Sequence, residues 1–157
     1  MRILGVDPGL ASTGWGVVDV KEGDILHVNH GCIQTSKTLS NSDRFLFIYK
    51  SINEIIASYK PEISAIEKLY FAKNAKSAMP VGEARGVLTL ALAQAGLEVF
   101  EFTPDAIKTA VTGVARADKR QVQEMVRIIL GLDAPPSPDH AADALASAIC
   151  AANTRRI

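Results

Sequence analysis

Four residues with metal-binding side chains stand where regular secondary structure would bring them together. Asp7 and Glu67 each end a short apolar run that has the pattern of a buried strand. If those two strands are parallel neighbours, both carboxylates emerge at the same edge of the sheet. His140 and Asp143 are three positions apart in a segment that is otherwise small or apolar, so they share one face of a helix.

Oxygen ligands with one imidazole suit Mg²⁺ or Mn²⁺, and two such ions can clamp the attacking and leaving oxygens of a phosphodiester. Asp7, Glu67 and His140, and Asp139 beside it, also have purely structural explanations. Asp7 precedes Pro-Gly and could be a turn residue, and Glu67 could lie at the surface of a strand end. Asp139 suits the positive end of a helix dipole, and a lone His140 is more often an ordinary histidine than a ligand.

The elements that must position these residues alternate in a recognisable order. Short polar turns separate the first three apolar segments, which predicts antiparallel hairpins. Strand and helix patterns then alternate, which predicts later strands parallel to the first and a mixed sheet covered by helices. We expect strands at 3–6, 13–20, 25–35, 63–66 and 97–102, and helices at 42–60, 75–95, 104–111, 118–130 and from 138 to about 152.

Two of the expected helices carry prolines with a positional meaning. Pro80 should start or kink the helix at 75–95. Ser137 followed by Pro138 predicts a capping serine with proline at the first helical position. The helix from Pro80 onward is apolar nearly all round, which predicts burial in a core or at a subunit interface.

Bulk properties limit the class of protein. The chain has 157 residues, 48% of them hydrophobic and 22% charged, with neither an internal repeat nor a linker, so we expect a single domain over 1–157. We see no membrane-length apolar run and no signal peptide, and we expect a cytoplasmic protein. Cys32 and Cys150 match neither a zinc spacing nor a disulfide framework, and we expect both to be buried thiols.

Charge is uninformative in total and more telling in its distribution. The 17 basic and 17 acidic residues cancel, whereas proteins that bind nucleic acid are usually basic. Between Lys108 and Arg127, however, basic residues outnumber acidic ones. If acidic residues gather in an active site, the net charge of the whole chain underestimates how basic the surface is elsewhere. A solvated helix face explains the same run.

Four segments resemble the RuvC family of Holliday-junction resolvases. They follow the order and spacing of that family across the chain, and the total length agrees. The matching segments are GVDPG at 5–9 with TGWG at 13–16, AIEKLYFAKN at 65–74, GEARGV at 82–87 and AADALA at 141–146. The resemblance implies an α/β, RNase H-like fold with a mixed five-stranded sheet flanked by helices, a homodimer, and Mg²⁺-dependent nicking of two symmetric strands.

The resemblance also assigns the acidic residues. Asp7, Glu67 and Asp143 fall on acidic catalytic and metal-binding positions. The fourth position is His140, where some members of the family carry aspartate and others histidine. We favour His140 over Asp139 as the fourth ligand because its three-residue offset from Asp143 keeps it on the same helix face, although Asp139, offset by four, could also reach.

Contacts with DNA and partners are implied in the same way. Tyr70 occupies the position of an aromatic that contacts the junction, where it could stack on an unpaired base, and we expect one of the two rings at 70 and 71 to belong to the core. Lys73 follows close by, and Lys108 and Lys119 match basic positions near the scissile phosphate. The family further implies dimerisation through the helix at 80–95 and partnership with the branch-migration proteins RuvA and RuvB.

The expected reaction is hydrolysis by a metal-activated water, leaving a 5′-phosphate and a 3′-hydroxyl, with His140 holding a metal or moving a proton.

Three alternative classes of protein remain. A nuclease of the YqgF group shares the opening motif but lacks the Ala-Lys-Asn segment. An actin-like ATPase would need two lobes. A junction-binding module without catalysis would not need all the acidic positions.

Overall fold

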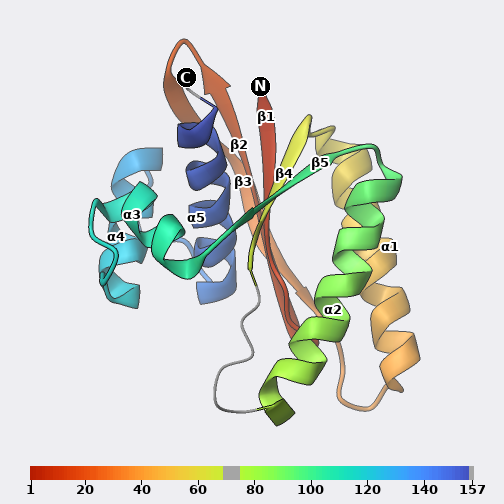
Figure 1. The fold of residues 1–157 in the computed structure, drawn as a ribbon. Coiled ribbons are helices and arrows are strands. Elements are labelled where there is room, and N and C mark those ends of the chain that lie inside the picture. The colour runs from red at the N-terminus through yellow and green to blue at the C-terminus, as the bar shows by residue number, and fades with distance from the viewer. Residues whose placement is uncertain (69–74, 156–157) are drawn as a thin grey trace.

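The computed structural model describes residues 1–68 and 75–155 and builds them around one five-stranded sheet (Figure 1). The strand order is β3-β2-β1-β4-β5. Neighbouring strands from β1 to β3 are antiparallel, and β4 and β5 are parallel to β1, as the sequence predicted. The strands are β1 (Arg2–Asp7), β2 (Ser12–Lys21), β3 (Asp24–Gln34), β4 (Ile63–Glu67) and β5 (Glu98–Phe102).

Helices cover both faces of this sheet. Figure 1 shows α1 and α2 together on one face, and α5 on the other face with α3 and α4 outside it. The expected mixed five-stranded sheet flanked by helices is confirmed. The helices are α1 (Asn41–Tyr59), α2 (Ala75–Gln94), α3 (Pro104–Thr112), α4 (Lys119–Leu130) and α5 (Asp139–Thr154).

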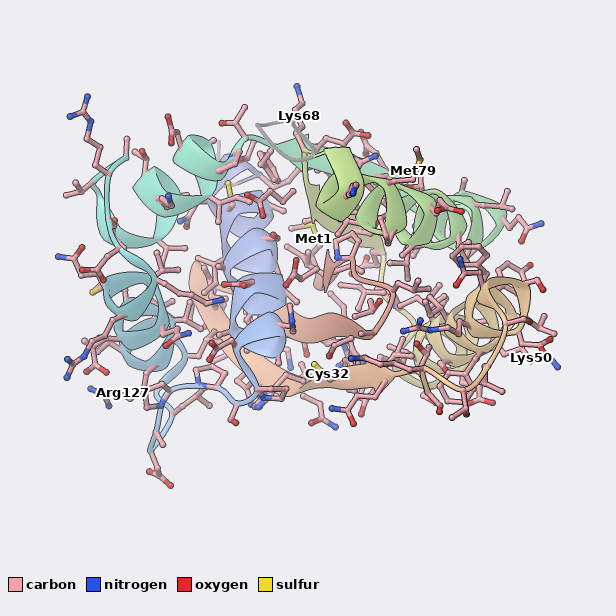
Figure 2. All side chains as sticks on the ribbon, turned by 90° about the horizontal axis from the view of Figure 1, so that it is seen from below. Met1, Cys32, Lys50, Lys68, Met79 and Arg127 are labelled. Atoms are coloured by element: carbon pink, nitrogen blue, oxygen red, sulfur yellow. The ribbon has the colours of Figure 1, made fainter. Side chains whose placement is uncertain are left out.

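Side chains fill the space on both sides of the sheet. In the view of Figure 2, Lys50 on α1 and Arg127 on α4 lie at opposite outer sides of the molecule, with the sheet between them. Two buried clusters result, one under α3, α4 and α5 and one under α1 and α2. None of the helices in the described part of the chain is long and apolar enough to cross a membrane.

The alternation of side chains along each strand decides which face the acidic residues occupy. Ile3 belongs to the cluster under α5, and its neighbour Leu4 belongs to the cluster under α1 and α2. Because every second residue shares a face, Asp7 follows Ile3 onto the α5 face. On β4 the same alternation carries Glu67 onto the face of Ala65, which also packs under α5.

Helix α5 packs unusually close to the sheet because glycines face it. A Cβ atom built on Gly5 would lie 1.9 Å from the carbonyl oxygen of Ala144, and one on Gly14 would lie 1.9 Å from that of His140. The helix itself is made mostly of small, fully buried residues. This close approach brings the first turn of α5 to the ends of the central strands.

The two prolines singled out in the sequence compare differently with the expectations: one cap is misplaced, and the other proline lies where a kink, one of its two expected roles, remains open. Helix α5 begins at Asp139, and Pro138, with an extended backbone, is its N-cap without a side-chain hydrogen bond. The expected cap at Ser137 is therefore wrong, because Pro138 with ψ of 175° lies outside the helix. Helix α2 begins at Ala75 as expected, with Pro80 inside it rather than at its start.

Burial of α2 is one-sided within the single chain, whereas the sequence predicted burial either in a core or at a subunit interface. Its inner face buries Leu88 and Leu92 completely, whereas Met79 is 64% and Leu90 is 55% exposed. The cysteines also differ from each other. Cys150 is buried as expected, but Cys32 is only half-buried because it lies on the edge strand β3; both are free thiols.

Candidate active site

Asp7 and Glu67 lie side by side at one edge of the sheet. The parallel ladder between β1 and β4 pairs Val6 with Ile66, so the next residue on each strand is the carboxylate. Both strands run in the same direction and end at the same edge, which confirms the geometry expected from the sequence.

The first turn of α5 adds an imidazole and a third carboxylate to this edge. His140 Nδ1 lies 2.8 Å from Asp7 Oδ2, which joins helix and strand by a hydrogen bond. One ligand atom from each of Asp7, His140 and Asp143 lies within 4.8 Å of the others. The Asp7 side chain is only 18% exposed, whereas those of His140 and Asp143 are 45% and 33% exposed, so the group opens to solvent on the α5 side.

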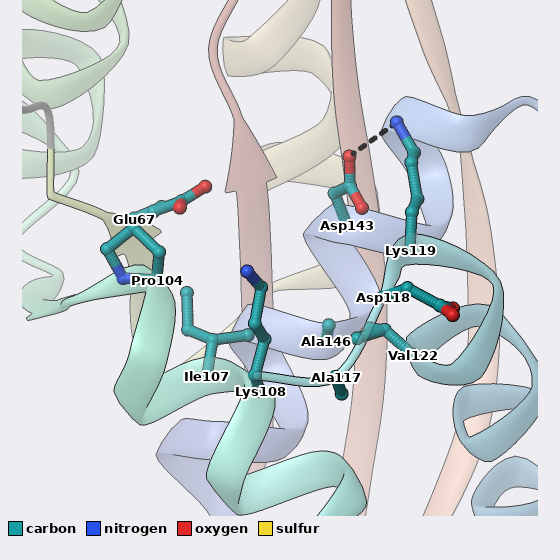
Figure 3. A pocket seen from close by; sticks show the side chains of 10 residues that line it. All are labelled: Glu67, Pro104, Ile107, Lys108, Ala117, Asp118, Lys119, Val122, Asp143 and Ala146. Carbon is teal, nitrogen blue, oxygen red and sulfur yellow. Dashed lines mark ion pairs between the residues drawn. The ribbon is translucent and has the colours of Figure 1, made fainter. Parts of the chain in front are cut away.

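Glu67 faces the same site across a pocket of about 320 Å³ (Figure 3). It is not one of the three residues whose ligand atoms lie within 4.8 Å of one another. Figure 3 shows the Glu67 and Asp143 side chains on opposite sides of the pocket, with Lys108 between them. The floor is apolar and includes Ile107 and Val122 from α3 and α4. The pocket therefore combines charged and apolar side chains in its lining.

His140 and Asp139, the two candidates for the fourth position, have different surroundings. His140 contacts Asp7 directly, whereas the Asp139 side chain is 67% exposed and lies 3.7 Å from Lys119 Nζ. Lys119 Nζ also lies 3.6 Å from Asp143 Oδ2. The structure thus brings His140 into the acidic group and leaves Asp139 at its outer margin, paired with a lysine.

Burial raises the pKa of all three carboxyl groups in the site. The pKa of Asp7 is raised to about 6, chiefly by burial and further by Asp143, although the hydrogen bond from His140 acts in the opposite direction. Burial also raises the pKa of Glu67, with contributions from Asp7 and Asp143, while Lys108 lowers it. For Asp143 burial again raises the pKa, and Lys119 opposes it. Withdrawal from water is thus the largest cause of the raised pKa in all three carboxyl groups.

This donor set fits a divalent metal ion. Three carboxylates and one imidazole nitrogen supply mostly hard oxygen ligands, as Mg²⁺ and Mn²⁺ prefer. A cation placed among them would also remove the energetic cost of ionising buried carboxyl groups close together.

The basic residues expected near the phosphate lie at the same pocket. Lys108 on α3 and Lys119 at the start of α4 both line it. Tyr70 and Lys73, the other two residues expected to contact DNA, lie outside the described residues, so their predicted roles stay predictions.

Some residues that shape the site were missed by the sequence reasoning. Gly14 lies beneath α5, and the sequence does indicate its role. Gly14 and Gly16 are two positions apart, so they share one face of the strand and leave it without side chains. Thr13 is fully buried and donates a hydrogen bond of 2.7 Å to the carbonyl of Gly9, which holds the turn after Asp7. Arg85 contacts the main chain of Glu67, and nothing in the sequence pattern indicates that contact.

A mixed sheet of this strand order, with carboxylates at the ends of β1 and β4 and on α5, defines an RNase H-like nuclease. The family model for crossover junction endodeoxyribonuclease RuvC matches residues 3–151. The chain belongs to the RuvC family, whose members are endonucleases of DNA recombination and repair. This membership excludes the YqgF group and the actin-like ATPases as its family.

Relatives and solved structures match along nearly the whole chain. The crossover junction endodeoxyribonuclease RuvC of Treponema denticola is 52% identical over 96% of this chain and 85% of its own. The Chloroflexus aggregans protein of the same name is 51% identical over 98% of this chain and 94% of its own. The structure of Thermus thermophilus RuvC in complex with a Holliday junction substrate superposes with a TM-score of 0.92 at 35% identity, covering 99% of this chain and 95% of the other.

Proposed function

We propose that this protein resolves four-way DNA junctions by paired symmetric nicks, as a single nuclease domain over residues 1–157. The observation that carries the proposal is the convergence of Asp7, His140 and Asp143 within 4.8 Å, beside Glu67. The related Thermus thermophilus protein was solved with a Holliday junction substrate, which supports the same substrate here.

The proposed cofactor is Mg²⁺, two ions per site, with Mn²⁺ able to substitute. Asp7, Glu67, His140 and Asp143 would hold the ions, with Asp139 as the substitute for His140. When bound, the metal would supply polarisation of the scissile phosphate and of the attacking water.

The chain's own residues prepare the site in defined ways. Asp7 accepts a hydrogen bond from His140 when Nδ1 carries the proton, which orients the imidazole ring toward the site. Lys108 and Lys119 line the pocket, where their ammonium groups would bind phosphate and stabilise the charge that develops on its oxygens. Ile107 and Val122 in the lining would lower the local dielectric and so strengthen these interactions once DNA covers the pocket. The proposed products carry a 5′-phosphate and a 3′-hydroxyl.

Paired nicks require two sites related by symmetry, and we propose that the protein acts as a homodimer. Met79 and Leu90 on α2 are exposed apolar side chains of the kind that a subunit interface would cover. Tyr70 and Lys73 would contact the junction, and RuvA and RuvB would be its partners on DNA. We also propose a cytoplasmic location, which fits a protein that acts on DNA.

The test is cleavage of a synthetic mobile four-way junction in Mg²⁺ by the wild-type protein beside Asp7→Asn. We expect paired symmetric nicks from wild type, none from Asp7→Asn, and no cleavage of a linear duplex with the same arm sequences. End-labelled fragments report the position of the cuts and the chemistry of their ends. Binding without cleavage by wild type, in either Mg²⁺ or Mn²⁺, would instead indicate a non-catalytic junction-binding module, and no binding would remove the junction as substrate.

A further inference from the structure

Arg85 on α2 reaches across to the edge of the sheet that carries the site. Its Nε donates a hydrogen bond of 3.4 Å to the main-chain carbonyl of Glu67. Its Nη2 lies 3.2 Å from Glu101 Oε1 on β5. The Arg85 side chain is 19% exposed, so most of it is withdrawn from water. One guanidinium therefore joins α2 to the end of β4 and to β5.

The ladder of β4 with β5 extends to the pair of Glu67 and Phe102, one residue further than the ladder of β4 with β1. The ladder between β1 and β4 ends at the pair of Val6 and Ile66, so the carbonyl of Glu67 lies beyond its last pair. On the other side, Lys68 N donates to Phe102 O at 2.7 Å and holds the strand end against β5. Arg85 adds a side-chain contact to this carbonyl at the point where the pairing of β4 with β1 has ended.

The Glu67 side chain and Arg85 lie on different faces of the sheet. Its carboxylate lies on the α5 face and lines the pocket with Asp143. Arg85 approaches from α2, on the opposite face, and its partner Glu101 lies on that face too, because the flanking Phe100 and Phe102 pack with the α5 cluster. Arg85 thus contacts neither the pocket nor its lining side chains. It can influence the site through the backbone of Glu67.

Resting on the proposed function, we infer that Arg85 is a positioning residue for the candidate metal ligand Glu67. By holding the carbonyl of Glu67 and bracing it against β5 through Glu101, the guanidinium sets the orientation of the last peptide of β4. That orientation determines where the Glu67 carboxylate enters the site. A planar guanidinium suits this task because its fork of N–H groups addresses two acceptors at once, which a lysine ammonium cannot do in the same geometry.

The experiment compares Arg85→Gln with Arg85→Lys, Glu101→Gln and a matched control, Arg44→Gln. Arg44 donates a hydrogen bond of 2.8 Å to Thr35 Oγ1, so its loss also removes a part-buried arginine contact, but one between α1 and the residue that follows β3. Three quantities are measured on the full chain: the rise in unfolding temperature on titration with Mn²⁺ alone, junction binding in EDTA, and the cleavage rate at saturating Mn²⁺.

For Arg85→Gln we expect the half-saturating Mn²⁺ concentration in the thermal titration to rise about tenfold and the maximal cleavage rate to fall about tenfold, the size of effect typical of residues that orient metal ligands. Junction binding in EDTA should stay within about twofold, because the phosphate contacts are untouched. Arg85→Lys should recover part of the loss. Glu101→Gln should show a smaller change in the same direction, because Arg85 keeps its contact with the carbonyl.

The inference is overturned if Arg85→Gln and Arg44→Gln change all three quantities equally, because Arg85 would then only stabilise the fold. Loss of junction binding in EDTA with an unchanged Mn²⁺ titration would also overturn it, and would make Arg85 a DNA contact. The proposed function fails separately: a wild-type protein that binds Mn²⁺ but does not cut junctions rejects the resolvase activity, while the Mn²⁺ titration still decides the role of Arg85.

Discussion

Gly14 on β2 lies directly beneath the carbonyl of His140 on α5, so close that a Cβ atom on the glycine would meet that oxygen at 1.9 Å. His140 in turn contacts Asp7 on the neighbouring strand at 2.8 Å. The absence of a side chain at one strand position therefore decides how near the helix comes, and with it whether imidazole and carboxylate can meet.

Gly14→Ala should push the first turn of α5 away from the sheet and separate His140 from Asp7. The atom in the way is backbone, which cannot rotate aside, so we expect a loss of about 1–3 kcal/mol in the free energy of unfolding. Cleavage should fall further than this loss of stability explains. Denaturant unfolding and junction cleavage on the same preparations measure the two effects.

Gly86→Ala is the matched control for stability. Gly86 lies within α2, and a Cβ there would meet nothing within 4 Å. Alanine has a higher helix propensity than glycine, so this variant should be as stable as wild type or more stable by up to about 1 kcal/mol. Equal stability of wild type and Gly14→Ala would contradict the close-packing argument.

His140→Ala and Asp139→Ala should have opposite consequences for catalysis. His140 lies in the group with Asp7 and Asp143, whereas Asp139 is mostly exposed and lies near Lys119. We expect His140→Ala to reduce cleavage by about a hundredfold or more, in the upper range for loss of a catalytic proton-transfer group. Asp139→Ala should keep most of the activity. Single-turnover cleavage in Mg²⁺ measures both, and the reverse ranking would move the fourth position to Asp139.

The raised pKa of Asp7 predicts how metal-free stability depends on pH. The folded protein holds the Asp7 proton up to about pH 6, whereas the unfolded chain releases it near the ordinary value of 3.8. The stabilising contribution of this group is therefore complete below the unfolded pKa and is lost as pH rises toward about 6. The wild type should lose about 2–3 kcal/mol relative to Asp7→Asn across this window, since each pKa unit corresponds to about 1.4 kcal/mol.

Urea unfolding in EDTA across that pH range measures the difference between wild type and Asp7→Asn. The control is Asp133→Asn, which makes the same substitution at an exposed residue after α4. Added Mn²⁺ should reverse the ranking above about pH 6, because a bound cation stabilises the ionised carboxylates of the wild type. A wild type that loses stability relative to Asp7→Asn as pH falls would contradict the assigned direction of the pKa shift.

Lys119→Ala should weaken junction binding through the phosphate backbone and should do so more at low salt. Lys119 Nζ lies at 3.6 Å from Asp143 and 3.7 Å from Asp139, with its side chain 56% exposed, so it can turn toward a bound phosphate. Loss of one phosphate contact should lower the slope of log affinity against log salt by about one unit. Binding measured in EDTA at several salt concentrations tests this, with Lys50→Ala on the outer side of α1 as control. An unchanged slope would remove Lys119 from the DNA contacts.

The sequence alone determined the elements and much of the site, because both depend on local patterns. Apolar periodicity predicted the five strands and the order of the helices. The run before Asp7 and the run before Glu67 predicted two parallel strand ends at one edge, which the ladder of β1 with β4 confirms. The offset of three between His140 and Asp143 predicted a shared helix face, and the two residues do lie together with Asp7.

Only the tertiary structure decided which groups meet across elements. That His140 rather than Asp139 reaches Asp7 depends on how α5 is rotated and how closely it packs on Gly5 and Gly14, a balance of steric contacts between segments far apart in the chain. The contact of Arg85 with the carbonyl of Glu67 has the same origin. Every residue has a main-chain carbonyl, so the residue type does not reveal which one accepts a hydrogen bond from a distant side chain. The periodicity that predicts a helix or strand depends only on residues close together in the sequence. The distance between two side chains on different elements depends instead on how all the intervening elements pack.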